Sequence, residues 1–222
     1  MRGLPFRGGG THTINLVRRP SDLHHRHARA WAGLARQPFL LAVRDGRVSR
    51  SAIRRWLAQD YLFVEGLMRF QAGLLRRAPH AHRLILAQGV VYTVRELDWL
   101  HMQDLDLAAR PHPAVARYLD YLDELEAQPY PLAAVLHWAL QRCFIDAWLA
   151  VKPGAHWYGE GPLSELVRHW TLPEFQALLH DLGEIALEAE AQTDPARLEG
   201  HLGRMLAYEK AMWQMAWEYA QE

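Results

Sequence analysis

The chain has 222 residues, half of them hydrophobic, and its 25 basic residues balance its 25 acidic ones. This neutral balance gives no electrostatic reason to expect binding to nucleic acid or to a membrane surface. No apolar run is long enough for a membrane span, and residues 1–20 lack the apolar core of a signal peptide, so we expect a cytoplasmic protein. The single cysteine, Cys143, excludes an internal disulfide.

The pattern of apolar residues predicts an all-α protein. Residues 1–20 contain three consecutive glycines and two prolines, a composition typical of a loosely ordered arm. Residues 21–222 show apolar positions three or four apart and no strand-like alternation, so we expect a single domain built as a compact helical bundle. The predicted helices are 21–44 with a break at Gln37-Pro38, 50–77, 80–108, 113–127, 131–151 with a stop at Pro153-Gly154, 163–190 with a break at Pro173, and 195–220.

Three chemically capable side chains lie on apolar faces of these predicted helices. Asp60 falls on the apolar face of 50–77, Glu209 lies inside the apolar stripe of 195–220, and Cys143 continues the apolar face of 131–151. A carboxylate removed from water needs a partner, because burying an unpaired charge is costly. The pattern leaves open whether Asp60 pairs with an arginine such as Arg142 or Arg95, and whether the thiol only fills space.

Taken together, the three residues also suit a reaction. A thiol close to a carboxylate could attack an electrophilic carbon while the carboxylic acid protonates the leaving group, and the second carboxylate could orient the substrate. Glu96, Asp98 and His101 offer acidic and imidazole groups on one helix, but the paired Glu-x-x-His motifs of a bundle di-iron centre are absent. We therefore expect a small-molecule substrate, no metal and no cofactor.

Four stretches between residues 28 and 219 resemble the TenA/thiaminase II family. They are "PFLLAVRDGRVSRSAIRRWLAQDYLFV", "ELDWLH", "ALQRCFIDAWL" and "AYEKAMWQMAW". The family shares its fold with haem oxygenase and with the cofactor-independent oxidase of pyrroloquinoline quinone synthesis. The resemblance implies a haem-oxygenase-like bundle that assembles as a homo-oligomer, a dimer or a tetramer.

The resemblance also implies roles for individual residues. Asp60 would bind an aminopyrimidine ring, Cys143 would be the nucleophile, and Glu209 would move the proton between leaving group and water. Phe63 and Trp170 stand where thiamin-processing relatives have tyrosines, and Ala147 stands where they have a second aromatic residue. Together with Tyr208, these three residues would shape the substrate pocket.

The predicted function is thiaminase II-like hydrolysis. Such an enzyme replaces an amino or thiazolium group on the exocyclic methylene of a 4-aminopyrimidine by hydroxyl, in thiamin salvage. Because lost tyrosine hydroxyls change which ring a site accepts, the substrate stays open. The alternatives are an oxidase related to the pyrroloquinoline quinone enzyme or to di-iron relatives, a non-catalytic ligand-binding or regulatory TenA-like protein, and haem degradation through His24, His25 or His27.

Overall fold

The computed structural model describes residue 25 and residues 27–152 and 162–222. These residues form helices and connecting turns with no strand, which confirms the predicted all-α class. The predicted arm 1–20 and the predicted stop at Pro153-Gly154 lie outside the described residues. In chain order the elements are α2 (Ala28–Leu34), α3 (Pro38–Arg44), α4 (Arg50–Arg77), η1 (His80–His82), α5 (Arg83–His101), α6 (Pro113–Glu126), α7 (Tyr130–Val151), α8 (Pro162–Trp170), α9 (Pro173–Glu190) and α10 (Pro195–Gln221).

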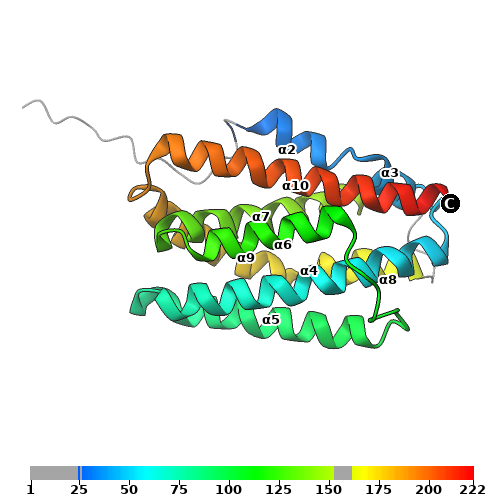
Figure 1. The fold of residues 1–222 in the computed structure, drawn as a ribbon, viewed down its shortest axis with the longest axis horizontal. Coiled ribbons are helices and arrows are strands. Elements are labelled where there is room, and N and C mark those ends of the chain that lie inside the picture. Colours follow the sequence, from blue (N-terminus) through cyan, green and yellow to red (C-terminus); the bar gives the residue numbers. More distant parts are fainter. Residues whose placement is uncertain (1–24, 26, 153–161) are drawn as a thin grey trace, which may run out of the picture.

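The long helices pack side by side around one hydrophobic core. Figure 1 shows α4 and α5 along one side of the bundle, and α10 with α2 and α3 along the other. α6 packs on α4, α9 packs on both α7 and α5, and α10 contacts α4, α6 and α7. Four long helices, α4, α5, α7 and α10, therefore have faces available to enclose a site. Within the part of the chain that is described, no helix is both long and apolar enough to cross a membrane.

Most predicted boundaries are confirmed to within one or two residues. α4 occupies 50–77 and begins after Ser49, whose hydroxyl oxygen accepts a hydrogen bond from the backbone N–H of Ala52 at 3.2 Å. α10 begins after Asp194, which caps the backbone N–H of Arg197 in the same way. The predicted break at Pro38 separates α2 from α3, and the break at Pro173 separates α8 from α9.

The predicted helix 80–108 is wrong at its end, because α5 stops at His101. Asp104 has a φ of 52°, in the left-handed region that does not continue an α-helix. Its backbone carbonyl accepts hydrogen bonds from the guanidinium of Arg54, and the carboxylate of Asp106 accepts from the backbone N–H of Ala108. The hydrogen bonds at these two aspartates therefore favour turns in this segment, although its apolar pattern predicts a helix.

An aromatic cluster fixes one end of the bundle. Trp56 of α4 lies with ring centroids 5.2 Å from Phe39, 5.7 Å from Trp148, 5.4 Å from Trp170 and 6.0 Å from Trp213. These rings come from α3, α4, α7, α8 and α10, and all five are buried. Aromatic packing of this kind contributes through its large buried area and its ring geometry. Five helices are thereby held rigidly beside the cavity described below.

The cap of α4 gives a direct test of this helix, which carries Asp60. We expect Ser49→Ala to lower the free energy of unfolding by about 1 kcal/mol, because the N–H of Ala52 loses its acceptor. The matched control is Ser51→Ala, an exposed serine two residues on, which should change stability by less than about 0.5 kcal/mol. Urea unfolding of the three proteins measures the difference, and equal stability of both variants would contradict the capping role.

Candidate active site

A cavity lies between α4, α5, α7 and α10, with further contacts from α6, α8 and α9. Its walls are mostly aromatic and aliphatic, with Trp56, Phe63, Phe144, Trp170 and Trp213 among them. The described lining residues include no lysine, arginine or histidine. Besides the tryptophans, the polar side chains on the wall are Asp60, Tyr92, Thr93, Glu96, Tyr118, Gln141 and Glu209.

Asp60 faces this cavity without a protein partner among the described residues. Its side chain is 5% exposed, and no hydrogen bond or ion pair joins it to another described residue. Arg142 instead bonds to Asp146 at 2.7 Å, and the guanidinium of Arg95 lies over the ring of Tyr92. The alternative of a structural ion pair between Asp60 and either arginine is therefore wrong.

Burial raises the pKa of Asp60 well above its usual range, and the charges of Glu96 and then Glu209 raise it further. The charges of two other carboxyl groups on the cavity wall thus act on Asp60. The folded protein favours the protonated form of Asp60. In that form the carboxyl group offers one O–H donor and one C=O acceptor to a ligand.

Glu209 of α10 is the second carboxyl group, and it has one hydrogen-bond donor. The hydroxyl of Tyr118 donates to Oε1 of Glu209 at 2.6 Å. Burial raises the pKa of Glu209 to about 7, and the hydrogen bond from Tyr118 opposes part of that rise. A carboxyl group with a pKa near neutrality can both give and take a proton, as a general acid and base must.

Sequence reasoning did not place Tyr118, which the structure puts on the cavity wall. Its ring lies 4.8 Å from that of Phe63 and 5.4 Å from that of Tyr208. Burial, together with Glu209, raises the pKa of the Tyr118 phenol well above its usual range, so it stays a donor. The wall thus carries a hydroxyl beside Phe63, which has none. The available signal was a tyrosine on the apolar stripe of the predicted helix 113–127.

Glu96 of α5 is a second wall residue that was not predicted from the sequence, where it was considered only as a possible metal ligand. His169 donates through Nε2 to one of its oxygens at 2.5 Å, and Trp170 donates through Nε1 to the other at 2.9 Å. Across the described ranges, no three His, Cys, Asp or Glu side chains are grouped so that they could hold a metal ion. Of the three carboxyl groups on the cavity wall, Glu96 thus accepts two hydrogen bonds, Glu209 accepts one, and Asp60 accepts none from the described residues.

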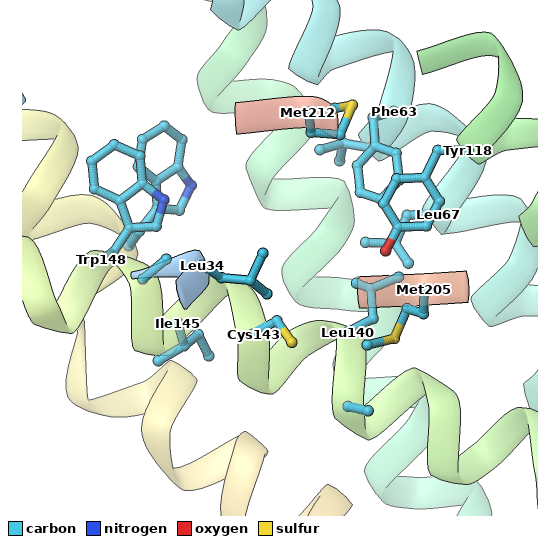
Figure 2. Packing of buried hydrophobic residues seen from close by; sticks show 14 of the residues in the cluster. Leu34, Phe63, Leu67, Tyr118, Leu140, Cys143, Ile145, Trp148, Met205 and Met212 are labelled. Atoms are coloured by element: carbon cyan, nitrogen blue, oxygen red, sulfur yellow. The ribbon is translucent and has the colours of Figure 1, made fainter. Parts of the chain in front are cut away.

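The structure places the predicted residue Cys143 behind the cavity wall. Its side chain is 2% exposed, and the wall is formed instead by Leu140, Gln141 and Phe144 of the same helix. Figure 2 shows Cys143 projecting from α7 within the apolar cluster that also contains Leu140. Burial raises the pKa of the thiol well above its usual range, and the charge of Glu209 adds to the rise. The geometry therefore favours the thiol over the reactive thiolate.

The remaining predicted residues divide between wall and core. Phe63 and Trp170 line the cavity together with Asp60 and Glu209. Ala147 is buried and is not among the lining residues. Tyr208 also lies off the wall and packs behind Tyr118.

The raised pKa of Glu209 predicts a pH-dependent stability. A carboxyl group with a folded pKa of about 7 and an ordinary value of 4.5 keeps its proton in the folded chain while the unfolded chain loses it. Stability is therefore lost as the pH rises from 4.5 to about 7, by about 3 kcal/mol in all. We expect Glu209→Gln to reduce the fall in unfolding free energy between pH 5 and pH 8 by about 2 kcal/mol.

The matched control is Glu184→Gln, which changes an exposed glutamate of α9. It should leave the pH dependence of the wild-type protein unchanged. Urea unfolding at the two pH values measures both variants. An equal pH dependence in Glu209→Gln and the wild-type protein would contradict the raised pKa.

Comparisons with known proteins agree with this architecture. A "Probable bifunctional TENA-E protein" from Glycine max is 24% identical over 211 residues, which cover 86% of this chain and 90% of that protein. A TenA homologue of known structure from Pyrococcus furiosus has a TM-score of 0.81 at 20% identity, covering 88% of this chain and 98% of its own. A TenA homologue from P. horikoshii OT3 has a TM-score of 0.80 at 17% identity, covering 91% of this chain and 100% of its own.

The fold and the family follow from two further matches. A domain from Shewanella denitrificans described as having a heme oxygenase-like fold gives a TM-score of 0.68 at 13% identity, over 90% of this chain and 93% of its own. The structure therefore has the haem-oxygenase-like fold. The family model described as TENA/THI-4/PQQC matches residues 24–219. The chain belongs to the TENA/THI-4/PQQC family.

Proposed function

We propose that this protein is a thiaminase II-like hydrolase, which replaces an amino or thiazolium group on the exocyclic methylene of a 4-aminopyrimidine by hydroxyl. Membership of the family and the similarity to a TENA-E protein support the class of activity. The observation that carries the proposal is Asp60, which is buried at the cavity wall and has no partner among the described residues. A buried carboxyl group without a partner is accounted for by a ligand that supplies one.

Asp60 suits one edge of an aminopyrimidine ring. In its protonated form its O–H donates to a ring nitrogen, and its C=O accepts from the neighbouring amino group. The aromatic wall offers flat faces for the ring itself, with Trp56 and Trp170 among them. Since no described lining residue is basic, the cavity suits a ligand rich in donors or positive charge.

Glu209 supplies the proton that the reaction needs. With an aminomethyl substrate, Glu209 in its protonated form gives a proton to the leaving nitrogen, so that neutral ammonia departs; a thiazolium nitrogen keeps the electron pair of the broken bond and leaves as a neutral thiazole without a proton. The bond between that nitrogen and the exocyclic methylene breaks, and the methylene forms a new bond to oxygen. A carboxyl group with a pKa near 7 is matched to this task at neutral pH. The hydroxyl of Tyr118 holds Glu209 in place.

A matched pair of substitutions tests the role of Asp60. Asp60→Asn keeps one donor and one acceptor, whereas Asp60→Leu keeps only the volume. We expect Asp60→Leu to lower kcat/KM for 5-aminomethyl-4-aminopyrimidine at least about 100-fold, because a site built around hydrogen bonds loses most when they are removed. Asp60→Asn should retain more of the activity than Asp60→Leu.

The assay measures release of the hydroxymethyl pyrimidine, from the aminomethyl compound and from thiamin. Thermal unfolding checks that Asp60→Leu is folded, and removal of the buried carboxyl group should not lower its stability. Equal activity of the two variants would contradict recognition through Asp60. No turnover by the wild-type protein would overturn the proposed hydrolysis, and ligand binding without turnover would favour a binding protein.

The role of Cys143 needs a test of its own. The resemblance assigns the first attack to this thiol, and that assignment stays a prediction. Because the thiol lies behind the wall and favours its protonated form, we expect Cys143→Ala to keep kcat within about threefold of wild type. Loss of turnover in a folded Cys143→Ala protein would instead support attack by the thiol.

A further inference from the structure

Glu96 is the third carboxyl group of the cavity, and α8 holds it in a fixed orientation. Its side chain is on the wall and is 11% exposed. Both of its oxygens accept hydrogen bonds from neighbouring residues of α8, one from His169 and the other from Trp170. The ring of His169 is itself held by stacking on Trp99, with centroids 4.0 Å apart and 14° between the planes. The carboxylate of Glu96 is thus preorganised before any ligand binds.

The three carboxyl groups differ in the hydrogen-bond donors that the described residues give them. Glu96 has two donors, Glu209 has one from Tyr118, and Asp60 has none. Hydrogen bonds donated to a carboxylate stabilise its ionised form. The titratable groups near Glu96 include His169 on α8, which hydrogen-bonds to it, and Asp60 on α4, whose pKa its charge raises. Of the three, Glu96 is therefore the carboxyl group best supported as a base.

We propose that Glu96 is a catalytic residue that takes the proton from the attacking water, and that His169 is a positioning residue acting through it. This inference rests on the proposed hydrolysis. The water oxygen forms a bond to the exocyclic methylene carbon, and the bond from that carbon to the leaving nitrogen breaks. With the aminomethyl substrate, the electron pair stays on the nitrogen, which receives a proton from Glu209, while the proton of the water passes to Glu96.

The cycle then closes without a further reactant. After the step Glu96 carries a proton and Glu209 lacks one, so transfer of one proton between them restores the starting state. Asp60 lies on the same cavity wall as both residues, and their charges raise its pKa. An acid and a base that are held in different hydrogen-bonding surroundings are the usual arrangement for transferring protons at neutral pH. The reaction consumes one water and releases one amine.

A purely structural role for Glu96 would make different predictions. If its carboxylate served only to attach α8 to α5, a substitution would lower stability and loosen ligand binding. A base acts in the transition state, so its loss lowers kcat while KM changes little. Glu96→Gln keeps the size of the side chain and one oxygen acceptor, but the amide cannot take a proton. This variant therefore separates the two roles.

We expect Glu96→Gln to lower kcat for 5-aminomethyl-4-aminopyrimidine at least about 100-fold, with KM within about threefold of wild type. The matched control is Asp98→Asn, which changes an exposed carboxylate on the same helix and should keep wild-type kinetics. Binding is followed by quenching of tryptophan fluorescence, since Trp56, Trp170 and Trp213 line the cavity. Wild-type kcat in a folded Glu96→Gln protein would overturn the proposal.

Substitutions at His169 test the positioning role and serve if Glu96→Gln does not fold. We expect His169→Ala to lower kcat about tenfold with little change in KM, because Glu96 loses one of the donors that orient it. His169→Gln restores a side-chain N–H donor and should recover most of kcat. A higher KM with unchanged kcat in His169→Ala, or no recovery in His169→Gln, would contradict positioning through Glu96. Absence of turnover in the wild-type protein would overturn the hydrolysis itself.

Discussion

The enclosure of three carboxyl groups without a lining cation in the described residues is the constraint on which the rest of this site depends. Two carboxylates brought together in a mostly apolar space repel each other, and no basic side chain among the described lining residues compensates their charge. Burial and then the charges of Glu96 and Glu209 raise the pKa of Asp60 well above its usual range, and burial alone raises the pKa of Glu209 to about 7. Stability is given up to create groups that can donate and accept protons, a cost that functional sites commonly carry.

The folded state tolerates this loss of stability because long, well-packed helices form the walls of the cavity. α4 and α10 carry Asp60 and Glu209, α5 carries Glu96, and α7 closes the opposite side. The aromatic cluster around Trp56 joins five helices next to the cavity, so their relative positions are set by close ring contacts. A rigid scaffold of this kind fixes side-chain directions more accurately than a loop does.

The sequence predicted the features that have a strong helical period. Asp60 and Glu209 could be identified because each interrupts an otherwise apolar stripe on a long helix, which the structure confirms as buried. The helix end at His101 was missed because a turn built on Asp104 depends on a hydrogen bond from Arg54, 50 positions away in the chain.

Two features of the cavity wall could not be predicted from the sequence, again for physical reasons. α7 is buried around most of its circumference, so its apolar pattern cannot tell which face meets the cavity and which meets the core. Cys143 was therefore expected at the wall, where the structure places Phe144 and Gln141. Glu96 has its partner His169 on a helix 73 positions later, a distance over which periodicity carries no information.

The central claim, that Asp60 on the cavity wall retains its proton in the folded protein, is tested most directly by infrared titration of the carboxyl groups. The account predicts a protonated carboxyl absorption that persists in the folded protein well above the pH at which ordinary carboxyl groups ionise, of which Asp60→Leu removes one part and Glu209→Gln another. Complete ionisation of the carboxyl groups at the pH of ordinary surface aspartates and glutamates would contradict it.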